Sequence, residues 1–143
     1  MKVKDQLFRG VTDTHRAVFL ASKGKIGGRL LGMPVVMLTT TGRRTGKTRH
    51  SMLATPLELG DSFVLVASFG GDDRHPTWFL NLRENPAVEA TLRGRTRKMK
   101  ARIASGEERA DLWIRLTAAH SNYAGYQTKT DREIPVVVLD PVA

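Results

Sequence analysis

Short stretches of strand-forming residues, separated by turn residues, recur along this chain and restrict its fold more than any other feature. A fully apolar run over residues 63–68 follows the turn Leu59-Gly60-Asp61-Ser62, and two alternating stretches flank the turn Arg93-Gly94-Arg95. Six strands are predicted in this way, at residues 34–40, 49–58, 63–68, 87–93, 96–104 and 134–139. Helices do not alternate with these strands, as they would in a doubly wound fold. The sequence therefore predicts a mainly β chain with helical insertions (α+β), whose six or so antiparallel strands close into a small barrel.

The last predicted hairpin shows the alternation of a half-buried sheet. Apolar residues recur at every second position in each of its strands, at Val88, Ala90 and Leu92 and then at Met99, Ala101 and Ile103. We expect both sets to face the core. The third strand, at residues 63–68, is apolar throughout, so we expect it to lie in the centre of the sheet.

Three helical segments are also predicted. Apolar residues fall at helical spacing over residues 3–21, and a glycine-rich basic loop continues to residue 32. Pro76 and Pro86 bound a second helix, because proline suits a helix start and disfavours helical backbone in the residue before it. Ser105 and Glu108 have the spacing of a capping box, which begins a third helix. We expect a single domain over residues 1–143, in which residues 1–32 form the N-terminal helix and the basic loop.

Positive charge is concentrated in two parts of the chain. Lysine and arginine number 23 against 14 acidic residues, which gives a net charge of +9. No acidic residue lies between Asp13 and Glu58, and a second acid-free block covers residues 93–102. Such a field attracts nucleic acid, an anionic membrane or an acidic small molecule, and composition does not rank the three.

The chain lacks the signals of secretion and membrane insertion. It contains no cysteine, no apolar run near the roughly 20 residues of a membrane span, and no apolar leader after Met1. We expect a cytoplasmic protein. Peripheral membrane contact through the basic, amphipathic N-terminal helix stays open as an alternative to packing on the domain's own core.

The most distinctive motif is a basic loop between the first two predicted strands. It combines five threonines, two glycines and four cations in Leu38-Thr39-Thr40-Thr41-Gly42-Arg43-Arg44-Thr45-Gly46-Lys47-Thr48-Arg49-His50. Glycines let backbone N–H groups turn toward one centre, and the cations add charge and directed donors. A nucleotide-binding P-loop is excluded, because Thr41 stands where that motif needs glycine and a strand follows instead of a helix. We therefore predict a polyanion site in preference to a solvated basic turn.

The usual catalytic motifs are absent from the sequence. No H-E-x-x-H motif, close histidine pair, Gly-x-Ser-x-Gly elbow or seated carboxylate pair occurs, so no metal site is expected. An enzyme with this inventory needs a cofactor to carry the chemistry. Candidate polar groups beside a ligand, each of which also suits a structural role, are Ser68, His75, Asn81, His120, Tyr123 and Tyr126.

Five segments occur together in a characteristic order over about residues 30–140. They are Thr41-Gly42-Arg43-Arg44-Thr45-Gly46-Lys47 with Arg49, Val66-Ala67-Ser68-Phe69-Gly70-Gly71 with His75-Pro76, Trp78 and Asn81-Leu82, Asn85-Pro86 with Val88, Gly106-Glu107-Glu108-Arg109, and Tyr126-Gln127 with Lys129-Thr130, Arg132 and Ile134-Pro135-Val136. With them the chain resembles the deazaflavin-dependent nitroreductase family of actinobacteria. These proteins have a split β-barrel of the FMN-binding-like kind and use reduced coenzyme F420, an 8-hydroxy-5-deazaflavin.

The resemblance implies a set of coenzyme-binding residues. The phosphate and glutamate tail would be held by Arg43, Arg44, Thr45, Gly46, Lys47 and Arg49. The ring would be contacted by Thr39, Ala54, Thr55, Pro56, Ala67, Ser68, Phe69, Thr77, Trp78 and Asn81, with Tyr123 beside it. Tyr123 and Tyr126 match tyrosines of the family's substrate site. Two positions depart from the family's nitroreductase, which has a lysine at the place of Phe69 and a further tyrosine at the place of His120.

The resemblance implies hydride transfer from reduced F420 to an electron-poor acceptor such as an activated alkene, a quinone or a nitro compound. We expect Tyr126, Tyr123, Ser68 or His120 to polarise the acceptor or relay a proton. FMN is the alternative coenzyme, although its single phosphate gives less reason for four cations. A non-catalytic deazaflavin or flavin carrier and, less favoured, a basic nucleic-acid-binding domain are the alternative functions. The sequence leaves monomer and homodimer open.

Overall fold

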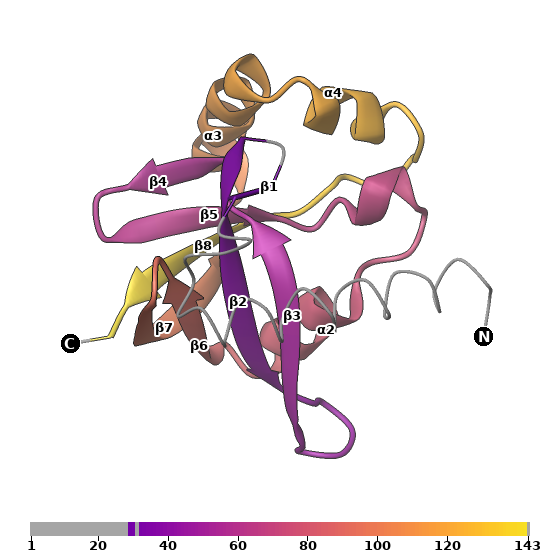
Figure 1. Ribbon diagram of the computed structural model, residues 1–143. Helices are drawn as coiled ribbons and strands as arrows, with labels where there is room; N and C mark the ends of the chain where they lie inside the picture. Colours follow the sequence, from indigo (N-terminus) through magenta and orange to yellow (C-terminus); the bar gives the residue numbers. More distant parts are fainter. Residues whose placement is uncertain (1–28, 31, 143) are drawn as a thin grey trace.

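The computed structural model of the protein describes residues 29–30 and 32–142 (Figure 1). Its strands are β1 (Arg29–Leu30), β2 (Met33–Thr41), β3 (Thr48–Ala54), β4 (Leu57–Leu59), β5 (Ser62–Val66), β6 (Ala87–Leu92), β7 (Arg95–Ile103) and β8 (Val136–Pro141). Its helices are the short 3-10 turn η1 (Phe69–Gly71), α2 (Thr77–Glu84), α3 (Gly106–Ala119) and α4 (Asn122–Gln127). The helix predicted at residues 3–21 lies outside the described residues, as does most of the basic loop after it.

All eight described strands belong to one antiparallel sheet. The order is β1-β2-β6-β7-β8-β5-β4, and β3 pairs with β2. The sheet curls, so that β4 and β5 run across β2 and β3 in Figure 1. Within the described residues no ladder joins β4 back to β2, so the barrel is split along this side. The predicted class, a mainly β split barrel with helical insertions, is confirmed.

The predicted strand at residues 49–58 is in fact two strands. β3 pairs with β2, whereas β4 pairs with β5, so the chain changes partner between Ala54 and Leu57. Pro56 has no N–H group to donate to a ladder. Thr55 stabilises the corner, because its hydroxyl donates to Val64 O at 2.7 Å. This break and the short strand β1 account for eight strands where the sequence predicted about six.

The predicted hairpin at residues 87–104 is confirmed as β6 and β7. Arg93 and Gly94 both have positive φ, at 51° and 77°, as a two-residue hairpin turn requires. Met99 and Ala101 are buried as expected. Ile103 is not, since 43% of it is exposed at the end of β7.

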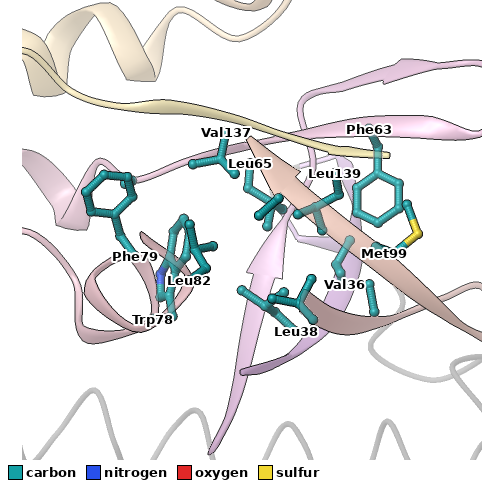
Figure 2. Packing of buried hydrophobic residues seen from close by; sticks show 14 residues of the cluster. Val36, Leu38, Phe63, Leu65, Trp78, Phe79, Leu82, Met99, Val137 and Leu139 are labelled. Atoms are coloured by element: carbon teal, nitrogen blue, oxygen red, sulfur yellow. The ribbon is translucent and has the colours of Figure 1, made fainter. Parts of the chain in front are cut away.

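The main core fills the inside of the curled sheet. Val36 and Leu38 from β2 meet Leu65 from β5 and Leu139 from β8, and Phe79 of α2 belongs to the same cluster (Figure 2). Trp78 and Leu82 of α2 also pack here. Helix α2 thereby becomes part of the core, and its position relative to β2 is set by apolar packing.

A second core lies on the opposite face of β5 and β8. Val64 and Val138 alternate with the residues of the first core and pack beneath Leu112 and Leu116 of α3. Because β5 and β8 are covered on both faces, their sequences are continuously apolar over residues 63–66 and 136–139. The third strand is thus covered on both faces, but the prediction that it lies at the centre of the sheet is wrong, because β5 is second from the edge, between β8 and β4.

Helix α3 begins where predicted but without the predicted cap. Ser105 is the N-cap residue, yet its side chain makes no capping hydrogen bond. Glu108 pairs with Arg102 of β7 instead of reaching back to Ser105. The ion pair outcompetes the local capping box because β7 runs beside the start of the helix. None of the helices within the described residues is long and apolar enough to cross a membrane.

Candidate coenzyme site

The predicted anion loop is the tip of the β2–β3 hairpin, at the lower end of the molecule in Figure 1. Gly42 N donates to Lys47 O at 2.7 Å, and Gly46 N donates to Gly42 O at 2.9 Å. Lys47 N donates to Thr45 Oγ1 at 3.2 Å. Gly46 has φ +70°, which glycine adopts without strain. These bonds give the loop a defined shape.

The backbone of the loop offers fewer free donors than the sequence suggested. Four of the amides at residues 42–47 already donate to groups of the protein. Among the described residues, only the amides of Arg44 and Thr45 in this loop have no hydrogen-bond acceptor. An anion would therefore be held mainly by side chains, with these two amides in support.

Asn81 of α2 fixes the loop to the body of the protein. Its Oδ1 accepts from Arg43 N at 3.2 Å and from Arg43 Nη1 at 3.1 Å. Its Nδ2 lies 3.5 Å from Thr40 Oγ1 of β2. Asn81 is only 2% exposed, and its side-chain amide is engaged with the loop and with β2. The geometry favours a role in positioning the loop over direct contact with a ring.

The cations of the loop have no acidic partner among the described residues. Arg44, Lys47 and Arg49 are exposed and Arg43 is half-buried, and no carboxylate of the described chain lies within ion-pair distance of them. Four uncompensated positive charges close together favour binding of a polyanion. The predicted anion site therefore keeps its electrostatic basis in the folded protein.

The second basic block differs, because acidic residues neutralise part of it. Arg93 pairs with Glu58 at 2.6 Å, and this hydrogen bond raises the pKa of Arg93. Arg102 is bonded to Asp140 and to Glu108, and those bonds raise its pKa in the same way. The second basic block is thus a solvated surface in which part of the positive charge is ion-paired.

Several residues predicted to line the ring turn inward. Thr55, Pro56 and Ala67 are buried, and Trp78 is 7% exposed within the main core. Thr55 uses its hydroxyl on backbone oxygens. If the ring binds here as predicted, these side chains would support the wall of its site from behind. Accessible surface at the predicted contacts comes from Thr39, Ala54, Phe69 and Thr77, which are half-buried or exposed.

Thr39 lies on β2, two residues before the end of that strand, and pairs with His50 of β3. Its hydroxyl is 2.9 Å from His50 Nδ1 on the neighbouring strand β3. The sequence had treated His50 only as the end of the motif. The pair extends the polar surface of the loop along the hairpin toward its base.

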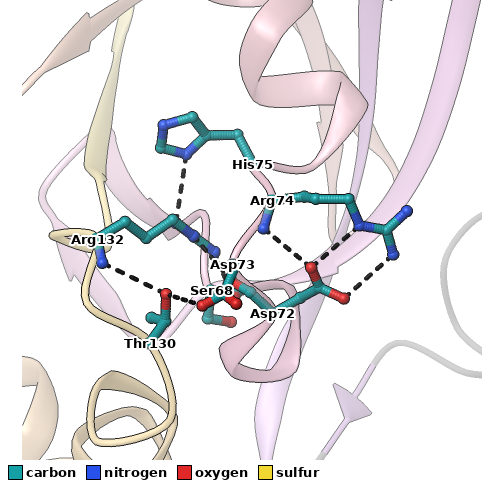
Figure 3. A network of polar contacts seen from close by, with 7 residues as sticks. All are labelled: Ser68, Asp72, Asp73, Arg74, His75, Thr130 and Arg132. Atoms are coloured by element: carbon teal, nitrogen blue, oxygen red, sulfur yellow. Dashed lines mark hydrogen bonds and ion pairs between the residues drawn. The ribbon is translucent and has the colours of Figure 1, made fainter.

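Ser68 and Phe69 lie in the turn after β5. Arg132, which is distant in sequence, holds this turn in place. Arg132 donates to Ser68 O at 2.9 Å and to Asp72 O at 2.9 Å (Figure 3). It also donates to Ala67 O at 3.1 Å. Arg132 belonged to the motif that carried the family resemblance, but its role was not predicted. These contacts join residues 60 to 65 positions apart, which no local pattern reveals.

The two predicted site tyrosines have different environments. Tyr123 is 6% exposed, and its hydroxyl lies 3.5 Å from Met33 Sδ. Burial, with a smaller contribution from Tyr126, raises the pKa of Tyr123 to about 12. Tyr126 is half-buried and packs edge-on against Tyr123, with ring centroids 6.0 Å apart. A proton is therefore harder to remove from Tyr123, and Tyr126 is the more accessible hydroxyl.

His120 and His75 occupy the ends of helices. His120 is the half-buried C-cap of α3 and precedes the helix that carries the tyrosines. His75 Nδ1 lies 3.3 Å from Arg132 Nη1, and its ring packs against Phe79. Burial, Arg132 and Arg83 all lower the pKa of His75. Within the described residues, no cluster of three histidine or acidic side chains has the geometry of a metal site.

Comparison with known proteins places the chain among coenzyme-dependent reductases. A family model described as F420H(2)-dependent quinone reductase matches residues 11–141. An F420H(2)-dependent quinone reductase of Mycobacterium tuberculosis is 37% identical over 129 residues, which cover 87% of this chain and 86% of that protein.

Solved structures agree with this relationship. An F420-H2 dependent reductase (FDR-A) has a TM-score of 0.67 and 42% identity, covering 75% of this chain and 94% of its own. A second structure, a domain-swapped dimer, has a TM-score of 0.70 and 37% identity, covering 90% and 96%. The predicted relationship to deazaflavin-dependent reductases is confirmed, and the chain belongs to the F420H(2)-dependent quinone reductase family.

Proposed function

We propose that this protein transfers a hydride from reduced coenzyme F420 to an electron-poor acceptor, with a quinone as the first candidate. The observation that carries the proposal is a cluster of four cations, without an acidic partner among the described residues, on a loop that Asn81 holds in place. The names of the relatives support the same coenzyme and acceptor. Family membership favours a reductase over a carrier and over a nucleic-acid-binding domain.

The loop suits the acidic part of this coenzyme. F420 carries a phosphodiester and a glutamate tail, so it brings several negative charges to one surface. Arg44 and Lys47 are exposed, and the amides of Arg44 and Thr45 are free to donate. Each hydrogen bond to a charged group is worth about 1.5–3 kcal/mol. FMN has one phosphate, so most of the positive charge of the loop would stay uncompensated if FMN were bound.

The residues at the other end of the site would orient the ring and exclude water. The bound reduced deazaflavin supplies the hydride. Ser68 and Phe69 lie on a turn that Arg132 holds, and Thr77 begins the helix that is anchored in the core. Holding donor and acceptor in a productive geometry can lower a barrier substantially without any catalytic acid or base.

A quinone needs one proton besides the hydride to become a hydroquinone. We assign the donation of this proton, or of a hydrogen bond to the acceptor oxygen, to Tyr126 in preference to Tyr123. Tyr126 is half-buried, whereas the hydroxyl of Tyr123 is buried against Met33 and has a raised pKa. Ser68 and His120 remain the other candidates from the sequence.

An anaerobic assay tests the proposal. The purified protein is mixed with reduced F420 and menadione, and the absorbance of the oxidised coenzyme is followed with and without protein. Reduced FMN at the same concentration is the matched control. Faster oxidation with F420 than with FMN is expected. Tight binding of F420 without oxidation would instead identify a carrier, and binding of generic DNA that falls steeply with salt would favour a nucleic-acid function.

Assembly and location follow as further parts of the proposal. The dimeric relative supports a homodimer, which light scattering at several protein concentrations would test. We expect the protein in the cytoplasm. Peripheral membrane contact through the helix predicted at residues 3–21 stays a prediction from the sequence, and sedimentation with anionic liposomes would decide it.

A further inference from the structure

The turn after β5 has a left-handed backbone that is unfavourable for Phe69, the first of its three residues. Phe69, Gly70 and Gly71 have φ values of 46°, 63° and 85°, all in the left-handed region. Glycine adopts this region freely, but Phe69 has a side chain that disfavours it. A non-glycine residue keeps such a conformation only where surrounding groups hold it. The same turn carries two of the predicted ring contacts, Ser68 and Phe69.

The guanidinium group of Arg132, from a distant part of the chain, holds the turn by hydrogen bonds to its backbone. Its Nη2 donates to Ser68 O at 2.9 Å and its Nε to Asp72 O at 2.9 Å (Figure 3). Its Nη1 donates to Ala67 O at 3.1 Å. Three carbonyls that bracket the turn thus converge on one planar guanidinium. Within the turn, Gly71 N donates to Ser68 O at 2.9 Å, so that oxygen accepts two bonds.

Arg132 is itself held in place by its neighbours. Its carbonyl accepts from Gln127 Nε2 at 2.7 Å, and its amide donates to Thr130 Oγ1 at 3.3 Å. The Thr130 hydroxyl in turn donates to Asp73 Oδ1 at 2.8 Å. Because these contacts fix the backbone of Arg132, its side chain approaches the turn from one direction.

The same turn packs tightly against α4, which carries Tyr126. A Cβ built on Gly71 would lie 2.8 Å from Tyr126 O and 2.9 Å from Lys129 Cβ. Backbone therefore meets backbone here without room for a side chain. Arg132 and this close approach together fix the turn with Ser68 relative to the helix with Tyr126.

Arg132 also selects the protonation form of His75. Arginine can only donate, so His75 Nδ1, 3.3 Å from Arg132 Nη1, must accept. The proton of the neutral ring then lies on Nε2. Burial first, and the charges of Arg132 and Arg83 next, lower the pKa of His75, which agrees with a neutral ring.

We propose that Arg132 is a positioning residue, whose guanidinium fixes the turn at residues 67–72 against α4 and so sets the geometry of hydride transfer. The inference rests on the proposed function and deepens it. It separates two tasks: the β2–β3 loop binds the coenzyme tail, and Arg132 orients the far end of the site. Figure 1 draws the two regions well apart, with the loop at the lower end and α4 at the upper end.

Lysine cannot replace Arg132 in this role. Its single ammonium group is a point donor and lacks the planar fork that reaches three carbonyls at once. Arg132→Lys keeps the charge and removes the fork. Arg102→Lys is the matched control, because Arg102 also joins distant elements through a forked contact, to Glu108 and Asp140, away from the turn.

Three measurements on both variants and the wild type test the inference. Hydrogen exchange of the protein alone should become faster at the Gly71 and Asp72 amides in Arg132→Lys only. The kcat with reduced F420 and menadione should fall roughly 10- to 100-fold, as expected for a small misplacement of reactants. The Kd for F420 should stay close to the wild-type value. Added guanidinium ion should partly restore the kcat of Arg132→Ala.

Two results would overturn the inference. One is equal kcat in Arg132→Lys and Arg102→Lys, and the other is unchanged exchange at the turn in Arg132→Lys. Failure of the proposed function is recognised separately, because it requires that the wild type itself does not oxidise reduced F420. In that case the exchange measurement still decides whether Arg132 holds the turn.

Discussion

Replacement of Gly71 by alanine tests how closely the turn after β5 packs against α4. The new Cβ would meet Tyr126 O at 2.8 Å and Lys129 Cβ at 2.9 Å. The left-handed backbone costs alanine about 1–2 kcal/mol, and the stiffer unfolded chain offsets roughly 0.4–1 kcal/mol of this. Overpacking adds about 1–3 kcal/mol. The expected loss of unfolding free energy is therefore about 1–4.6 kcal/mol.

Gly70→Ala is the matched control for this measurement. Gly70 also has a positive φ, at 63°, but a Cβ there would meet no atom within 4 Å. It should cost only the backbone penalty, about 1 kcal/mol. Urea unfolding of both variants gives the two free energies, and their difference isolates the close approach to α4. The reasoning fails if Gly71→Ala is as stable as Gly70→Ala.

Three further predictions concern the site. Arg44→Ala and Lys47→Ala should each weaken F420 binding about 10- to 100-fold, through loss of a charged hydrogen bond, with little change in acceptor preference; normal binding by fluorescence titration would contradict this. Tyr126→Phe combined with Ser68→Ala should lower turnover with quinone, and unchanged turnover would remove both from the mechanism. His75 has a lowered pKa in the folded protein, so the folded state binds fewer protons than the unfolded state. Its stabilising contribution is present above the unfolded pKa of 6.5 and is lost as pH falls toward the folded value. The urea midpoint of His75→Gln should therefore change less between pH 7.5 and 5.5 than that of the wild type, and parallel curves would disprove the assignment.

Most elements of the fold could be predicted because their signals are local. The turn at Arg93 and Gly94, the prolines that bound α2 and the apolar run of β5 each depend on residues close in sequence. The break at Thr55 and Pro56 was missed, because it depends on which strand each half pairs with. The capping box at Ser105 was wrong for a similar reason, since Arg102 of β7 takes the Glu108 carboxylate.

The candidate site was predictable in its charge and less so in its geometry. The cations of the β2–β3 loop are adjacent in sequence, and they remain without acidic partners among the described residues. The use of Asn81 as the anchor of Arg43 joins residues 38 positions apart. Tyr123 and Tyr126 differ in burial. This difference could not be predicted from two tyrosines close together on one short helix.

The sequence by itself determined the strand pattern, the basic loop and the family of this protein, because alternation, turn chemistry and charge are properties of neighbouring residues. Only the tertiary structure decided which groups meet around the site. Asn81 reaches the loop and Arg132 reaches the turn after β5 because the curled sheet brings together segments that are distant along the chain. Those contacts depend on packing in three dimensions, for which a linear pattern of residue types contains no signal.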